Sequence, residues 1–178
     1  AALLRRREMA ALIALRARTL RGRARSGKDL LVIGQKAAVD ALRALGLPTN
    51  AEAVHFNALS GLDRWRGVAG MMVLGRTLPA PLTVEALAAA LTNRPPLTSR
   101  GEVAWWYGRV ERRIALAEGG VHAIAGEEHA DPTAEAVRWS ICEGELVQAV
   151  GRGRGVNRTA ETPLEIDVLT DVVLPVAV

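Results

Sequence analysis

The sequence has few cysteines, few aromatic residues and no long apolar run, and each shortage excludes a class of protein. One cysteine, Cys142, excludes an internal disulfide and a zinc site built from several cysteines. Aromatic residues make up only 3% of the chain, which argues against an all-β sandwich. No apolar run is long enough to span a membrane and no signal peptide is visible, so we expect a cytoplasmic protein without a membrane partner.

Hydrophobic residues, by contrast, make up 49% of the 178 residues, and charged residues make up 24%. This composition allows a sizeable buried core, and the length is that of one ordinary domain with or without an appendage. The chain begins with Ala1, and its last segment, residues 174–178, is apolar to the end. We therefore expect a piece of a longer protein.

Positive charge is concentrated near the N-terminus. Residues 1–28 contain nine Arg and Lys residues against Glu8 alone, whereas the rest of the chain contains 14 basic and 18 acidic residues. An arginine-rich arm can bind phosphates. An apolar stripe at helical spacing, which includes Leu12, Ile13 and Leu20, equally fits the solvated basic face of a connecting helix. We expect a basic amphipathic helix or linker over this region.

Short apolar runs alternate with helix-like segments along most of the chain. Runs that are apolar on both faces are typical of strands in a parallel sheet. The strands expected from this pattern are 29–34, 54–56, 69–75 and 164–169. The expected helices are 2–21, 35–45, 84–92, one that starts at Asp131, and about 141–151. Two strand-like runs, 109–117 and 121–125, flank a Glu-Gly-Gly turn and predict a β-hairpin.

Capping residues suggest where three of these helices begin. Thr83 is expected to cap the helix over 84–92. Asp131 and Pro132 fit the N-cap and first helical position of the next helix. Ser140 and Glu143 have the spacing of a capping box, which predicts a further helix start near residue 141.

Strands that alternate with helices predict an α/β fold with a mostly parallel sheet flanked by helices. We expect one such domain over residues 29–178, preceded by the basic helix and interrupted by a hairpin insert at about 94–130. Trp105, Trp106 and Tyr107 lie in this insert. Their rings can stack on nucleic-acid bases, or they can pack in the core.

Residues 22–28 spell G-x-x-x-x-G-K, the pattern of a phosphate-binding loop. Such a loop requires a strand before it, a helix after it, and Ser or Thr at the next position to hold Mg²⁺. Here a helix is expected before the segment and a strand after it. Asp29 occupies the Ser/Thr position, where its carboxylate would repel phosphates. We interpret the segment as a basic turn that leads into the first strand.

A second glycine- and arginine-rich segment, residues 148–155, lies at the end of the helix expected at about 141–151. Arg152 and Arg154 are two positions apart and are flanked by glycines, so they can project toward one point. The planar guanidinium group matches phosphate oxygens and keeps its charge. The spacing alone fits a phosphate site or a solvent-exposed Arg-Gly loop.

Three segments occur in an order that resembles superfamily 2 helicases. Gln148–Arg154 resembles motif VI in its compact Q-x-x-G-R-G-R variant. Residues 58–63 resemble motif V, in which a small hydroxyl residue, Gly and Asp follow a strand, and residues 29–36 resemble the strand and turn around motif IV. The chain therefore looks like the second, C-terminal RecA-like lobe of such a helicase, with phage-type primase–helicases among the candidates.

This resemblance implies a role for each motif. ATP in these enzymes lies between two lobes, and its phosphates and Mg²⁺ are held mainly by a first lobe that is missing here. The second lobe supplies arginines to the charge that develops on the γ-phosphoryl group, which implies catalytic roles for Arg152 and Arg154. The remaining implied residues are Gln148, Gly151 and Asp63 for the nucleotide, and Ser60 and Gly61 for the DNA or RNA backbone.

Some features depart from this resemblance. A DEAD-box protein has arginine where this chain has Gly155, and Arg154 stands one position earlier. Asp63 equally fits the N-cap of a turn at residues 64–66. No Walker A segment and no acidic Walker B segment is visible in the sequence.

Two other functions remain open at this point. The chain can be a non-enzymatic α/β module that binds nucleic acid or a protein partner through its basic arm, or a different small α/β enzyme. His55, His122 and His129 do not form a ligand set, so we expect no metal site within the chain.

Overall fold

The computed structural model describes residues 2–25, 27–58, 64–98 and 106–175. The chain divides into two compact units, each made of two separate stretches of sequence. Unit 1 comprises Ala1–Gly75 and Val147–Thr170, and unit 2 comprises Arg76–Leu146 and Asp171–Val178. In the described part of the chain, no helix combines the length and apolarity needed to cross a membrane.

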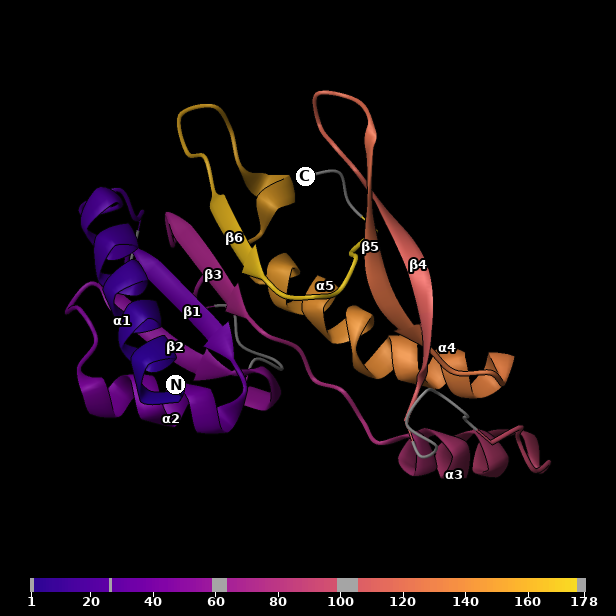
Figure 1. The fold of residues 1–178 in the computed structure, drawn as a ribbon. Helices are drawn as coiled ribbons and strands as arrows, with labels where there is room; N and C mark the ends of the chain where they lie inside the picture. Colours follow the sequence, from indigo (N-terminus) through magenta and orange to yellow (C-terminus); the bar gives the residue numbers. More distant parts are fainter. Residues whose placement is uncertain (1, 26, 59–63, 99–105, 176–178) are drawn as a thin grey trace. The chain divides into compact units, whose positions relative to one another are not determined.

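Unit 1 is built on a four-stranded, fully parallel sheet with the strand order β2-β1-β3-β6 (Figure 1). The strands are β1 (Leu30–Gly34), β2 (Ala51–His55), β3 (Gly70–Leu74) and β6 (Glu165–Leu169). All four strands expected from the sequence are present, although β2 begins earlier than expected and ends before Phe56, which starts a 3-10 turn. The α/β class with a parallel sheet is therefore confirmed.

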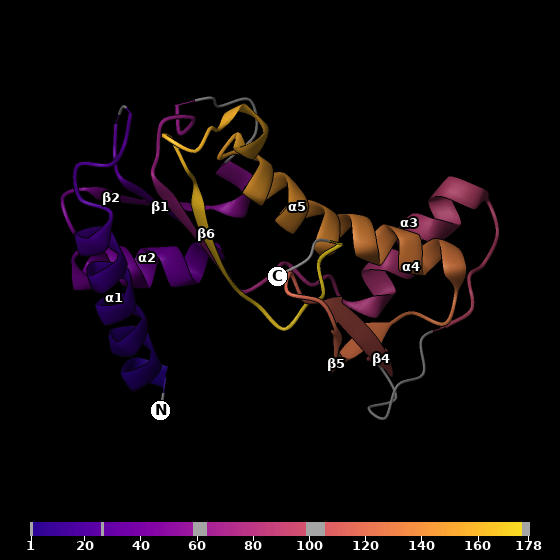
Figure 2. The same ribbon diagram turned by 90° about the horizontal axis from the view of Figure 1, so that it is seen from above.

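Helices cover both faces of this sheet, which explains why its inner strands are apolar throughout. On one face, a core cluster that includes Leu30, Val32 and Met72 packs against α1 (Ala2–Thr19) and α2 (Lys36–Leu45). On the other face, Leu31 and Met71 are also fully buried. Figure 2 shows α1 and α2 on one side of the sheet and the end of α5 (Glu143–Gly151) on the other.

The basic N-terminal helix is part of the core of unit 1. Ile13 and Leu20 on its apolar stripe are fully buried in the cluster that they form with the sheet. Arg16 forms ion pairs with Glu165 at 2.8 Å and Asp167 at 2.6 Å, which connect α1 to β6. The helix thus packs on the sheet through its apolar side and contacts the edge strand through one of its arginines.

Unit 2 contains the predicted β-hairpin. Its strands, β4 (Gly108–Ala115) and β5 (Val121–Glu128), pair in antiparallel register. The hairpin is accompanied by α3 (Pro81–Thr92), α4 (Pro132–Ile141) and the first turn of α5. The core cluster of this unit contains Val84 from α3, Tyr107 from the start of the hairpin and Ala134 from α4.

The structure confirms one of the predicted helix caps and corrects two. The Asp131 carboxylate accepts hydrogen bonds from the amides of Thr133 and Ala134, as predicted for the start of α4. Thr83 does not cap α3, because Pro81 already occupies the first turn and the N-cap is Ala80. Ser140 lies inside α4 and does not begin a new helix. Glu143, the other residue of the predicted capping box, instead accepts a hydrogen bond from the buried Arg138.

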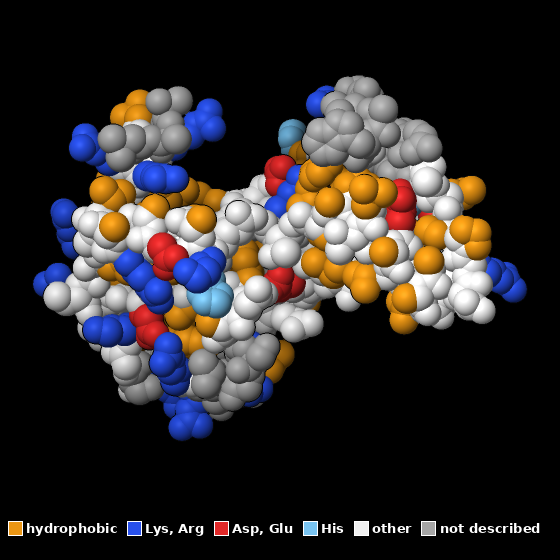
Figure 3. Space-filling model, turned by 90° about the horizontal axis from the view of Figure 1, so that it is seen from below, with side chains coloured by type: hydrophobic (Ala, Val, Ile, Leu, Met, Phe, Trp, Pro, Cys, Tyr) orange, Lys and Arg blue, Asp and Glu red, His pale blue; other side chains and the backbone are white. Residues whose placement is uncertain are grey.

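The outward face of α3 is apolar. Leu82 and Leu91 are largely exposed, and the only charged residue of the helix, Glu85, is directed to His129 within the unit. Hydrophobic side chains gather accordingly on the right-hand part of the view in Figure 3. Unit 2 therefore presents an uncharged surface on this helix.

Candidate functional site

The arginine-rich loop lies at the amino edge of the sheet, which we define as the edge where β1, β2, β3 and β6 begin. The last helical residue of α5 is Gly151, and Arg152 and Arg154 follow it before the chain enters β6 at Glu165. The loop also contains a short 3-10 turn, Gly155–Asn157. Because the strands are parallel, this edge brings together loops that precede different strands.

Gly153 fixes the loop closely against the sheet. A Cβ atom at this position would lie 2.5 Å from the Met71 sulfur and would also overlap the side chain of Leu164. A larger residue at this position would therefore require the ends of the Met71 and Leu164 side chains to shift. The next residue, Arg154, has a positive φ of 53°, which is uncommon for a residue with a side chain.

The two predicted finger arginines have different surroundings. Arg152 is half-buried, and its Nε atom is buried without a hydrogen-bond partner in the described part of the chain. Arg154 is exposed. Gln148 and Gly151 are exposed at the end of α5. A buried guanidinium N–H without an acceptor is costly, and the described residues provide no acceptor for the Nε–H of Arg152.

The predicted motif V residues, Ser60, Gly61 and Asp63, lie outside the described residues, but the segment that follows them is described. Arg158 donates hydrogen bonds to the carbonyl oxygens of Arg66 at 2.9 Å and Val68 at 2.8 Å. Its guanidinium group also donates to the carbonyl of the loop glycine, residue 153, at 3.0 Å.

Arg158 thus fastens the motif VI-like loop to the segment that follows the motif V-like one. Sequence reasoning missed this residue. Its only sequence signal is an arginine four positions after Arg154. Its carbonyl partners at residues 66 and 68 carry no sequence signal, because every residue has a carbonyl.

The G-x-x-x-x-G-K segment uses its backbone amides within the protein. The amides of Gly22 and Ala24 donate to the Asp29 carboxylate at 3.0 and 2.9 Å, and the Asn50 side chain donates to it at 2.8 Å. Burial alone would raise the pKa of Asp29, but these hydrogen bonds outweigh it and hold the pKa below its ordinary value.

A helix precedes this segment and a strand follows it, as the sequence interpretation requires. The amides that a phosphate-binding loop would direct at phosphate are occupied by the side chain of Asp29. The segment is therefore a turn stabilised by an internal anion.

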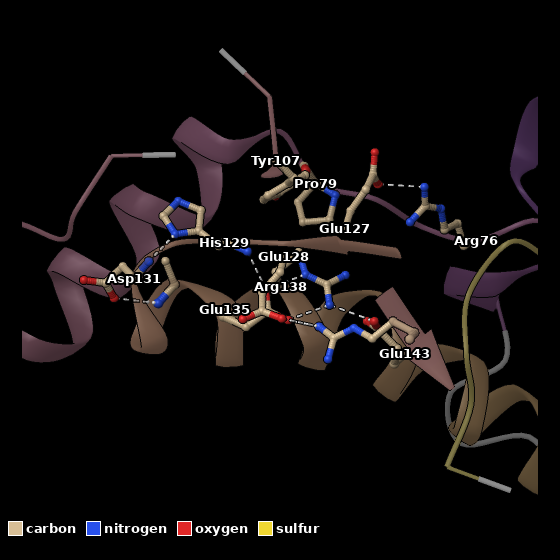
Figure 4. A network of polar contacts seen from close by, with 12 residues as sticks. Arg76, Pro79, Tyr107, Glu127, Glu128, His129, Asp131, Glu135, Arg138 and Glu143 are labelled. Carbon is tan, nitrogen blue, oxygen red and sulfur yellow. Dashed lines mark hydrogen bonds and ion pairs between the residues drawn. The ribbon is translucent and has the colours of Figure 1, made fainter. Parts of the chain in front are cut away.

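Unit 2 contains a network of charged side chains around a buried arginine, which the sequence did not reveal (Figure 4). Arg138 is only 1% exposed and pairs with Glu135 and Glu143, each at 2.7 Å. Burial opposes its charge, but the two carboxylates raise its pKa above the ordinary arginine value. Arg112 joins the network through Glu135 at 3.5 Å and also pairs with Glu128 at 2.8 Å. The structure thus keeps a fully buried arginine charged by surrounding it with carboxylates.

A polar cavity of about 420 Å³ adjoins this network and is lined by residues of unit 2. Arg76 on its wall pairs with Glu127 at 2.8 Å and Asp171 at 3.0 Å. Glu143 also lines the cavity, and its buried Oε2 atom has no hydrogen-bond partner in the described part of the chain. Cations and carboxylates are balanced here, so the cavity does not favour a ligand of one charge.

The aromatic residues of the insert serve the core where they are described. Tyr107 is 2% exposed and donates its hydroxyl hydrogen to the Pro79 carbonyl at 2.7 Å. Trp106 donates its indole hydrogen to Glu127 at 2.9 Å. These two rings pack within unit 2, whereas Trp105 lies outside the described residues.

The described histidines do not gather at a metal site. His129 is buried. Its Nδ1 atom accepts a hydrogen bond from the backbone amide of Asp131, and its Nε2 atom lies 3.1 Å from a carboxylate oxygen of Glu85. Among the described residues, no group of three or more His, Cys, Asp or Glu side chains has the placement to hold a metal ion. His129 therefore has a local packing and hydrogen-bonding role.

Comparison with protein families, with curated proteins and with solved structures finds no match to this chain. A functional site therefore has to be argued from the contacts within each of the two units. The arginines of the unit 2 network face carboxylates, whereas Arg152 in unit 1 has a buried donor without an acceptor among the described residues. The amino edge of unit 1 is therefore the better candidate for an anionic ligand.

Proposed function

We propose that the chain is the second, RecA-like lobe of an ATP-dependent superfamily 2 helicase or translocase. In this function, Arg152 and Arg154 neutralise the charge that develops on the γ-phosphoryl group of ATP bound by a first lobe. The observation that carries the proposal is the Nε–H of Arg152, which has no acceptor among the described residues and belongs to a loop that Arg158 fastens to residues 66–68.

The architecture of unit 1 supports this proposal. The segment that resembles motif IV contains β1, β2 precedes the segment that resembles motif V, and α5 ends in the segment that resembles motif VI. The loop after α5 is held in place by the close packing of Gly153 and by the hydrogen bonds of Arg158. Such fixing matters because arginines stabilise a transition state efficiently only when they are held in position beforehand.

Each candidate residue has a defined part in the proposed function. Arg152 is half-buried and offers a planar guanidinium group, whose geometry suits phosphate oxygens. ATP and Mg²⁺ would be held mainly by the first lobe, with the nucleotide also contacted by Gln148, Gly151 and Asp63. Ser60 and Gly61 would contact the DNA or RNA backbone.

A two-lobe protein tests the proposal. The 178-residue chain alone should show no ATPase activity above background, because the groups that hold the β- and γ-phosphates and Mg²⁺ belong to the first lobe. When the chain is joined to its first lobe, Arg152→Lys should lower kcat by at least about a hundredfold, because the ammonium group cannot reproduce the fork. The KM for ATP should change little, because the contact acts mainly in the transition state.

A matched control and a second variant complete this experiment. Arg94→Lys, at an exposed position of unit 2, should leave kcat unchanged. Arg154→Ala should resemble Arg152→Lys if it is the second finger. Near-wild-type ATPase activity in both Arg152→Lys and Arg152→Ala would refute the helicase-lobe function and favour a non-enzymatic module.

A further inference from the structure

Three loops that are remote in sequence meet at the amino edge of unit 1. The backbone amide of Arg25 donates to the Gly67 carbonyl at 2.8 Å, which joins the loop after α1 to the loop before β3. Arg158 joins that same loop to the one before β6 through the carbonyls of residues 66 and 68. Hydrogen bonds therefore hold the three loops together.

Some arginines of these loops are neutralised within unit 1. Arg23 pairs with Glu165 at 2.6 Å, and Arg64 pairs with Glu52. Arg25 and Arg158, in contrast, form no ion pair within the described residues, and Arg158 binds only neutral carbonyl oxygens. The charges of these two guanidinium groups are therefore not compensated by carboxylates of the described chain.

The two uncompensated arginines lie close enough to influence each other. Burial lowers the pKa of Arg158, and the positive charge of Arg25 lowers it further. Two guanidinium groups that repel each other, one of them partly buried, create a positive potential that an anion would relieve. The segment resembling a phosphate loop thus contributes the charge of Arg25 to this edge, whereas the amides of Gly22 and Ala24 bind Asp29.

We propose that Arg25 and Arg158 form a binding site for the phosphate groups of a nucleic-acid strand. Arg21 also lies exposed in the loop after α1, so the positive charge extends beyond a single point. An extended basic surface suits the evenly spaced phosphates of a polynucleotide, and the guanidinium fork suits each phosphate. The choice of nucleic acid as the partner rests on the proposed function, but binding at this edge requires no ATP hydrolysis.

Strand binding by the 178-residue chain tests this site without ATP. Fluorescence anisotropy of labelled dT20 should show at least about fivefold weaker binding for Arg25→Gln at low salt. The slope of log K against log salt should become shallower by about 0.7, the value for one lost contact to a single strand. Arg6→Gln, which removes an exposed arginine near the other end of α1, is the matched control and should bind like the wild type.

Arg158 requires a milder change because it also fastens the loops. Arg158→Lys keeps the charge and should weaken dT20 binding less than Arg158→Gln, with circular dichroism confirming that both variants fold. Binding by Arg25→Gln within twofold of the wild type, with the same salt slope, would overturn the proposal. Loss of binding in Arg6→Gln alone would assign the strand to the helical arm and would also overturn it.

A nucleotide is the other source of phosphate groups, and a second titration separates it from a strand. If Arg25→Gln weakens binding of fluorescent ADP but not of dT20, the site is a nucleotide site and the proposal fails. If it weakens dT20 binding alone, the proposal is supported. None of these outcomes depends on the ATPase of the two-lobe protein, so this site and the finger role of Arg152 can fail separately.

Discussion

Asp29 stands just before β1, and its carboxylate turns back toward the loop that precedes it. Replacing it with Asn keeps the shape but replaces an anionic acceptor of three hydrogen bonds with a neutral amide. Because hydrogen bonds to a charged group contribute about 1.5–3 kcal/mol, we expect Asp29→Asn to lower the free energy of unfolding by about that amount. Urea unfolding at pH 7 measures it.

The acid dependence of stability provides a second readout of the same change. The pKa of Asp29 is lower in the folded chain than its ordinary value, so its contribution is present above that ordinary value. It is lost as the pH falls through the folded pKa, because the unfolded state takes up the proton at a higher pH than the folded state does. The Asn variant should lack this part of the acid dependence, and an unchanged profile would contradict the prediction.

Residue-level contacts between distant segments were the part that the sequence did not predict. Arg138 lies in a helix that was expected, yet its burial depends on Glu143 in the next helix. Arg158 donates hydrogen bonds to the backbone carbonyls of Arg66 and Val68, and such contacts cannot be predicted from the types of the residues involved. Asp29, in contrast, was recognised as unsuited to a phosphate loop because its position next to Lys28 is local information.

Among the elements, α4 allows a paired test of helix capping. Asp131 accepts two amide hydrogen bonds at its N-terminus, so Asp131→Ala should lower the free energy of unfolding by about 1 kcal/mol. Thr83, which the sequence suggested as a cap, makes no such bond in α3, and Thr83→Ala should change stability by less than about 0.5 kcal/mol. Equal losses in the two variants, measured by thermal unfolding, would contradict the structure.

The strands were easier to predict than the helix starts. An inner strand of a parallel sheet is apolar on both faces, and the runs at β1 and β3 show this directly in the sequence. A helix start depends on which of several nearby polar residues accepts an amide. The helix α3 begins at Pro81, so its start lies before Thr83. At the start of α5, Glu143 pairs with Arg138 and does not form the capping box that its spacing from Ser140 suggested.

At the scale of the whole molecule, the division into two units predicts a localised response to mutation. Gly153→Val would place atoms where Met71 and Leu164 now lie, and overpacking of this kind costs about 1–3 kcal/mol. Amide exchange should accelerate in β1 and β3 of unit 1 and stay unchanged in the hairpin of unit 2. Gly155→Val is the control, because a Cβ there meets no atom within 4 Å.

The same experiment can contradict the division. Accelerated exchange in β4 and β5 to the extent seen in β1 would show that the two units open together. The candidate site was predicted only in part at this scale. The sequence pointed to Arg152 and Arg154, but the approach of Arg25 to the same edge requires the hydrogen bond between its amide and Gly67, which the sequence does not indicate.

The pairing of β3 with β6 also has a consequence for synthesis on the ribosome. Gly70 pairs with Glu165, 95 positions later in the chain, so unit 2 is translated almost completely before the sheet of unit 1 is closed. At about 5–20 residues per second, the edge of β3 waits on the order of 5–20 s for its partner strand. An open strand edge can pair with other chains, so the nascent polypeptide is most exposed to misassembly during this interval.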